Sequence, residues 1–175
     1  MATPGRTGET ITQASFVESL VKLISETPLE DRNRLLAGKK ISEPTLQQLS
    51  KTPLRGLFYD EADLTIAEIL NNYFSAIRRK WPDSWNDPTR QGNILPRTNA
   101  FKAFMVYLKE HAYPKAVDGK FGRVPSVDKF YEFFHDLELT DQDITTRAFA
   151  PGSSGQSLFL KVLNREVDPS TLFED

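Results

Sequence analysis

The clearest alternation of hydrophobic and polar positions in the chain spans residues 60–81. Apolar side chains recur there every three or four residues, which places them on one stripe of an α-helix. The stripe consists of Leu64, Ala67, Leu70, Tyr73, Phe74, Ile77 and Trp81. Acidic residues occupy the first turn and basic residues the last, as the helix dipole favours. Pro82 follows directly, so we expect this central helix to end at Trp81.

Shorter hydrophobic patterns predict further helices on both sides of this central one. Residues 12–27 form a first helix, and residues 29–52 hold one or two short helices, the second with Pro44 in its first turn. Later helices are predicted from residue 98 to near residue 111, at 126–137 with Ser126 as N-cap, at 141–149 with Thr140 as N-cap, and after residue 155. The residues expected to face the core are Phe16, Leu20, Leu23, Ile24, Phe101, Phe104, Met105, Leu108, Val127, Phe130, Phe133, Phe134, Leu137, Leu158, Phe159, Val162 and Leu163.

Turn-forming residues separate these helices. The sequence WPDSWNDP at 81–88 predicts a turn, and residues 114–124 predict either an irregular loop or a small two-stranded hairpin. These patterns predict a mainly α-helical, compact single domain of about six helices with irregular loops, formed by residues 11–167. Residues 1–10 are expected to form a flexible leader, and residues 168–175 an acidic tail.

The composition is that of a folded domain without thiol chemistry. Of 175 residues, 39% are hydrophobic and 11% aromatic, which is enough apolar surface for one core. The absence of cysteine excludes disulfides, thiolate nucleophiles and cysteine-ligated metals. No apolar run reaches the roughly 18 residues that a membrane span needs, and the N-terminus lacks the pattern of a secretory signal. We therefore expect a cytoplasmic protein without a membrane partner.

The sequence contains no complete set of catalytic or metal-ligating residues. His111 and His135 lie on different predicted helices and outside the HExxH spacing of zinc proteases. Ser153 and Ser154 do not form the GxSxG motif of a nucleophile elbow. We therefore predict no catalytic residue, no metal and no cofactor, and these features favour a binding protein over an enzyme.

Two basic segments are candidates for contact with nucleic acid or with a protein partner. Between residues 32 and 55, six basic residues stand against one acidic residue, and residues 78–80 are basic with two tryptophans close by. Cations beside exposed aromatic rings suit phosphate contact and base stacking. Helix-dipole complementarity and two core tryptophans explain the same residues without a partner. The candidate contact residues are Lys39, Lys40, Arg78, Arg79, Lys80, Trp85 and Arg97.

The Pro-Gly-Ser-Ser-Gly sequence at 151–155 is a candidate anion site. Small residues before a helix leave its first amides exposed, and such helix starts receive phosphate or carboxylate groups. The segment lacks the Gly-Lys-Ser/Thr end of a P-loop. In the alternative interpretation, a serine of this loop caps the last helix. The candidate anion-binding residues are Gly152, Ser153, Ser154 and Gly155.

Three segments together resemble a known family. LNNYFSAI at 70–77, WPDSWND at 81–87 and GSSG at 152–155, with an apolar helix at 98–108 between them, are similar to the C-terminal part of DGQHR-domain proteins. That family includes a regulator associated with DNA phosphorothioate modification. The Asp-Gly-Gln-His-Arg signature itself is absent here, so the role of that module does not carry over. The resemblance implies a stand-alone helical half that works with a separate partner in prokaryotic DNA modification or phage defence.

These observations lead to one preferred function and two alternatives. The preferred function is a non-catalytic accessory module that binds a protein partner, DNA or both. The first alternative is a phosphate-binding or small-ligand protein, or an enzyme, that uses residues 151–155 at a helix start. The second alternative is a structural subunit of a larger assembly, for which an exposed aromatic patch would be the sign.

Overall fold

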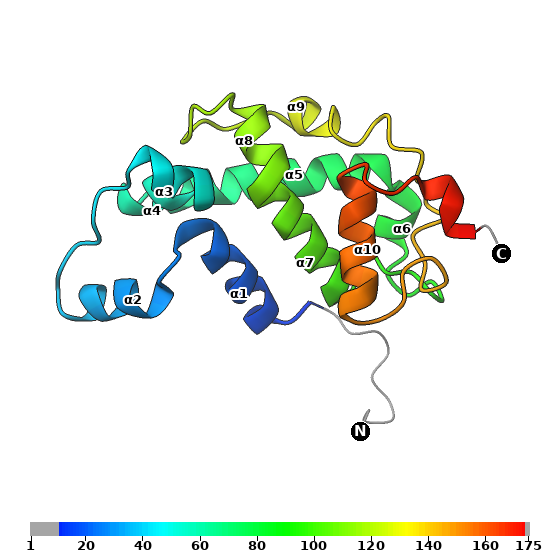
Figure 1. Cartoon of the computed structure of the whole chain (residues 1–175), viewed down its shortest axis with the longest axis horizontal. Helices are drawn as coiled ribbons and strands as arrows, with labels where there is room; N and C mark the ends of the chain where they lie inside the picture. The colour runs from blue at the N-terminus through cyan, green and yellow to red at the C-terminus, as the bar shows by residue number, and fades with distance from the viewer. Residues whose placement is uncertain (1–10, 174–175) are drawn as a thin grey trace, which may run out of the picture.

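The long helix predicted in the middle of the sequence is the central element of the fold. The computed structural model describes residues 11–173. In it the long helix, α5 (Asp63–Lys80), crosses α7 (Thr98–Tyr107) (Figure 1). α10 (Ser153–Leu163) lies beside α7, and α9 (Val127–Tyr131) packs on α5. The helices are α1 (Gln13–Ile24), α2 (Pro28–Leu36), α3 (Leu46–Lys51), α4 (Arg55–Tyr59), α5 (Asp63–Lys80), α6 (Pro82–Asn86), α7 (Thr98–Tyr107), α8 (Tyr113–Ala116), α9 (Val127–Tyr131) and α10 (Ser153–Leu163). The prediction of a mainly α-helical, compact single domain is confirmed.

Large aromatic side chains fill the core between these helices. The Tyr73 ring of α5 lies edge-on to Phe130, with ring centroids 5.3 Å apart, and its hydroxyl donates to the Phe104 carbonyl of α7 at 2.8 Å. Phe104 in turn meets Phe159 of α10 edge-on at 5.1 Å. Such edge-to-face contacts add to the burial of apolar surface. Aromatic contacts therefore link α5, α7, α9 and α10.

The buried face of α5 differs in part from the predicted stripe. Leu70, Tyr73, Ile77 and Trp81 are buried as expected, but Leu64 is 88% exposed. Ile66, Ile69 and Ala76 are buried instead. The buried face of α5 is centred on the side that contacts α9 and the aromatic side chains of α7, and this side is rotated from the one that the pattern predicts. A single helical stripe does not show which side its neighbours cover.

Short helices form at places where the sequence predicts none, and α3 begins later than predicted. Thr45 caps α3 by accepting from the Gln48 amide, so Pro44 lies outside that helix, contrary to the prediction. α4 lies in residues 53–59, between two predicted helical segments, and α6 lies within the predicted turn at 81–88. Six helices were therefore too few, because helices of five or six residues carry almost no periodic pattern.

The helix that begins at Thr98 continues beyond its predicted end. α7 runs into a π-helical turn, Leu108–Ala112, and then into α8, where Pro114 lies in the first turn. The π turn changes the hydrogen-bond register and proline has no amide to satisfy in a first turn, so the helix continues. Residues 117–124 form turns, and within the described residues no strand occurs there, so the hairpin alternative is wrong. The Tyr113 hydroxyl accepts from the Gly122 amide and fastens this loop.

The predicted helix at 141–149 does not form. The Thr140 amide does donate to Oδ2 of Asp143 at 2.7 Å, as in one half of a capping box. The chain then pairs with a distant loop, because the Thr146 amide donates to the Gly92 carbonyl at 2.8 Å and the Ile94 amide to the Ile144 carbonyl at 3.3 Å. Because these amide and carbonyl groups are hydrogen-bonded to a distant loop, they are not available for the hydrogen bonds of an α-helix.

The predicted helix at 126–137 begins where expected but is shorter than predicted. Ser126 caps α9 through the Lys129 amide at 3.1 Å, as predicted. α9 ends at Tyr131, however, and turns follow, with Phe134 and Leu137 buried as expected.

At the C-terminus, the predicted acidic tail includes a 3-10 helix, Pro169–Phe173, and Leu172 packs against the core. The predicted leader at 1–10 lies outside the described residues.

Candidate functional site

Two of the three basic residues at the end of α5 contact other parts of the chain. Arg79 Nη1 lies 2.6 Å from Asp128 Oδ1, and its guanidinium lies 4.3 Å above the Tyr131 ring. Lys80 Nζ donates to the carbonyl oxygens of His135 at 3.1 Å and Leu137 at 2.7 Å. Partial burial lowers the pKa of Lys80 from its usual value. Arg79 and Lys80 therefore attach α5 to the segment that contains α9.

The remaining predicted contact residues do not form one surface. Arg78 is exposed and has no hydrogen bond or ion pair with another described side chain. Lys39 and Lys40 are exposed in the loop after α2, at the opposite end of the molecule from the C-terminus of α5 (Figure 1). Arg97 precedes α7 and donates from Nε to the Asn93 carbonyl at 2.9 Å. These candidate contact residues therefore lie on separate parts of the surface.

The two tryptophans have different roles. Trp81 is fully buried, and its indole N–H donates to the Leu139 carbonyl at 2.8 Å. Trp85 on α6 is 38% exposed and lies at the edge of an open cavity. The interpretation that both are core residues therefore holds for Trp81 alone.

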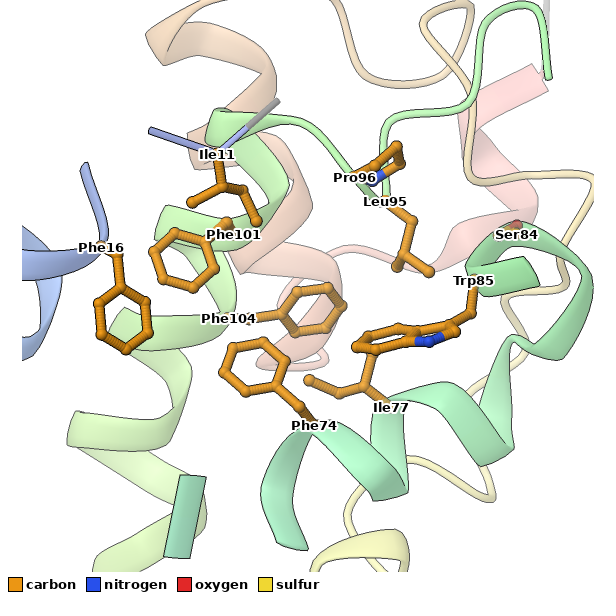
Figure 2. A pocket seen from close by; sticks show the side chains of 10 residues that line it. All are labelled: Ile11, Phe16, Phe74, Ile77, Ser84, Trp85, Leu95, Pro96, Phe101 and Phe104. Carbon is orange, nitrogen blue, oxygen red and sulfur yellow. The ribbon is translucent and has the colours of Figure 1, made fainter. Parts of the chain in front are cut away.

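That cavity, here called the aromatic groove, lies between α1, α5, α6 and α7. Its volume is about 450 Å³, and apart from one serine its lining is apolar. Figure 2 shows the side chains of α5 and α7 on one side and Trp85 on another, all directed toward the same space. The lining residues are Ile11, Phe16, Phe74, Ile77, Ser84, Trp85, Leu95, Pro96, Phe101 and Phe104.

Stacked rings give the aromatic groove its shape. Phe101 of α7 stacks on Phe74 of α5 with centroids 5.8 Å apart and planes 11° from parallel, and on Phe16 of α1 at 6.0 Å. Phe16 is nevertheless 38% exposed and Ile11 39% exposed. The helical pattern assigned Phe16 to the core, and it gave no signal that α1 leaves this part of the core open.

A smaller polar hollow lies where α7 and α10 begin. Its volume is about 240 Å³, and it brings together Arg97 and Lys102 of the α7 segment with Gly152 and Ser153. Neither helix start has a side-chain cap. The Lys102 ammonium also pairs with Glu18 at 3.2 Å. The residue pattern indicated Arg97 and residues 152–153 as separate candidates and gave no signal for Lys102, because nothing in the sequence relates α7 to α10.

The interpretation that a serine of the Gly/Ser segment caps α10 is wrong, and only Gly152 and Ser153 of the four candidate anion-binding residues line the polar hollow. Ser153 and Ser154 are the first residues of α10 and do not cap it, because Gly152 occupies the N-cap position. Gly155 is buried and does not line the polar hollow. A Cβ on Gly155 would overlap the Ala150 carbonyl oxygen and lie 2.8 Å from the Ala150 carbonyl carbon. Gly155 is therefore required for close packing of the loop on the helix.

Within residues 11–173, no group of three or more histidine or acidic side chains is arranged to hold a metal ion. No helix in the same range combines the length and hydrophobicity that crossing a bilayer requires.

Comparison with known proteins gives no relative. No protein-family model, curated protein or solved structure matches this chain. The resemblance to DGQHR-domain proteins therefore stays a prediction.

Proposed function

We propose that this chain is a non-catalytic binding module that holds an apolar side-chain cluster of a protein partner in the aromatic groove. The groove itself carries the proposal. Sites of roughly 300–1,000 Å³ with mainly apolar walls are typical of ligand and partner recognition. The resemblance to DGQHR-domain proteins supports a setting in prokaryotic DNA modification or phage defence.

The exposure of large side chains around the aromatic groove favours a partner. Ile11, Phe16 and Trp85 each remain between a third and half exposed. Complete burial of such side chains stabilises a complex by roughly 1.5–3 kcal/mol each relative to full exposure, so covering them offers part of that free energy. A buried aromatic anchor at the centre of an interface commonly dominates its affinity.

A protein partner is favoured over DNA at the end of α5. Arg79 and Lys80 already have intramolecular partners, so phosphate contact would have to compete with them. Simultaneous replacement of residues 78–80 by alanine would also remove contacts to the α9 segment. A loss of DNA binding in that triple variant would therefore not distinguish a DNA contact from a local change of structure.

Peptide selection provides a test of the aromatic groove. From a displayed library of random peptides, we expect the protein to enrich sequences with aromatic or large aliphatic anchors. Trp85→Ala and Phe16→Ala should each weaken the selected peptides by about tenfold or more, as replacement of an anchor-binding residue does. Trp81 is already buried, so a shift of tryptophan emission to shorter wavelength on binding should arise from Trp85.

The matched control for these variants is Leu64→Ala. Leu64 is the more exposed side chain, at 88%, and it does not line the aromatic groove. It should leave peptide affinity unchanged. Enriched peptides that bind the Trp85 and Phe16 variants as tightly as the unchanged protein would contradict the proposal.

A second candidate function is anion binding in the polar hollow, supported by the convergence of Arg97, Lys102 and two uncapped helix starts. Inorganic phosphate at about ten times its Kd should raise Tm by about 4 °C in a domain of this size. Lys102→Ala should abolish most of that shift, while Ser154→Ala, outside the hollow, should retain it. An unchanged Tm across millimolar phosphate would exclude this function.

A further inference from the structure

Helix α2 has its polar and apolar faces reversed relative to the core. Its one buried residue is Asp31. Leu29 is 73% exposed and Leu36 is 71% exposed. Because an α-helix has 3.6 residues per turn, residues seven apart share a face, and Asp31 lies on nearly the opposite side. The helix therefore presents leucines to solvent and a carboxylate to the protein.

Hydrogen bonds to Asp31 fix this orientation. The Arg55 guanidinium of α4 binds both Asp31 oxygens, at 2.7 and 3.1 Å, and the Ser25 hydroxyl donates to Oδ2 at 2.6 Å. Arg55 also donates to the Ile24 carbonyl at 3.1 Å. Turning the leucines inward would break this bidentate pair and leave Arg55 buried without its counter-ion. The exposed leucines are thus a consequence of how α2 is anchored.

The outward face of α2 has neighbouring positive charges. Arg32 lies between the two leucines on the helix surface, and Lys39 and Lys40 follow in the loop to α3. All three are exposed, and none forms an ion pair with another residue in the range 11–173. Apart from the Arg55 contact on its inner side, α2 has no extensive packing against another helix within residues 11–173, and it lies at one end of the molecule (Figure 1). The surface is therefore apolar, cationic and open.

We propose that this α2 surface, from Leu29 to Lys40, docks an acidic amphipathic helix of a partner protein. Leucines of that helix would cover Leu29 and Leu36, and its carboxylates would pair with Arg32, Lys39 and Lys40. This helix-in-groove chemistry uses apolar residues at i, i+3, i+4 and i+7 together with complementary charge. The proposal shares no residue with the aromatic groove and does not rest on it.

The charge and apolar content of the α2 surface disfavour other occupants. A second copy of the chain would bring the same cations against one another, which costs free energy. DNA offers phosphates but little apolar surface for two leucines. A membrane-surface helix needs a larger apolar face than two leucines on a nine-residue helix provide.

The test uses a fluorescein-labelled peptide of about 16 residues, long enough to form an isolated helix, with leucine on one face and glutamate on the other. A matched peptide carries lysine in place of every glutamate. Fluorescence anisotropy of the full chain should show binding of the acidic peptide and little binding of the basic one. Leu29→Ser with Leu36→Ser should weaken the acidic peptide by about tenfold or more. Arg32→Glu should weaken it as well and improve binding of the basic peptide.

Leu64→Ser, another highly exposed leucine on a different helix, is the matched control and should bind like the unchanged protein. Circular dichroism checks that each variant keeps its helix content. Equal binding of both peptides, or no effect of the Leu29/Leu36 substitutions, would overturn the proposal. The same holds if duplex DNA or phosphatidylserine vesicles bind with cation dependence but without leucine dependence, or if those leucine substitutions abolish a dimer seen by ultracentrifugation.

Discussion

Gly155→Ala is expected to destabilise the protein by about 3 kcal/mol or more. The added methyl would overlap the Ala150 carbonyl oxygen, a backbone atom that cannot move away as a flexible side chain can. Overpacking against a fixed neighbour typically costs 1–3 kcal/mol, and backbone overlap lies at or above the upper end. A decrease in Tm of about 10 °C corresponds to this loss in a domain of this size.

Gly152→Ala provides the control for this prediction within the same segment. Gly152 has φ of +98°, which alanine adopts with strain, but a Cβ there would have no atom within 4 Å. Its ψ of −167° places it in a backbone region that almost only glycine adopts, so we expect a cost of about 1–3 kcal/mol from the backbone conformation alone, smaller than that of Gly155→Ala. Urea unfolding of both variants measures the difference. Similar losses of free energy for the two would show that loop packing on Gly155 is not the cause.

Asp31→Ala is expected to destabilise the protein by about 3 kcal/mol, because it leaves the Arg55 guanidinium buried without its counter-ion. The side chains of Arg55 and Asp31 are 8% and 11% exposed, and Arg55 Nε already lacks a hydrogen-bond partner among the described residues. The double variant Asp31→Leu, Arg55→Met removes both charges and should recover most of the loss. A double variant as unstable as Asp31→Ala would show that packing, not the orphaned charge, causes the effect.

The same pair predicts a pH dependence of stability. Hydrogen bonding to Arg55 holds the pKa of Asp31 below its usual range, against the opposing effect of burial. A carboxyl with a lowered pKa in the folded state contributes stability above its unfolded pKa of about 3.9, and that contribution is lost as pH falls through the lower folded value. The free energy of unfolding should therefore decrease more steeply below about pH 4 in the unchanged protein than in Asp31→Ala.

Hydrophobic periodicity predicted the long helices that are covered by the core on one side. α7 and α10 bury the apolar residues expected of them, except for Leu158, which is only partly buried. The failures arise where the decisive contact is distant. Residues 141–149 pair with the 92–94 loop, which no local pattern shows. In α2, one ion pair to Arg55 decides which face is buried, so the leucines point outward.

The candidate sites were predictable to a similar extent. Residue type suggested Trp85 and Arg97 as contact residues and the 152–153 segment as an anion site, and each lines a cavity. Residue type did not show that Arg79 and Lys80 bond to the α9 segment, because a cation at a helix end looks the same whether solvent or protein receives it. The partial exposure of Phe16 depends on how far α1 lies from α6 across the aromatic groove, and the sequence pattern of α1 does not show this distance.

The pairing of the 92–94 loop with residues 144–146 also constrains the order of folding. These hydrogen-bond partners are about 50 residues apart in the sequence. Their hydrogen bonds cannot form until the chain between them has closed into a loop, and loop closure costs chain entropy. The packing of α10 on α7 closes a loop of similar length but also buries apolar surface, so we expect these helices to assemble before the loops become ordered. Thr146 lines the polar hollow, so one wall of that hollow takes shape late in folding, after the helical core that supports it is in place.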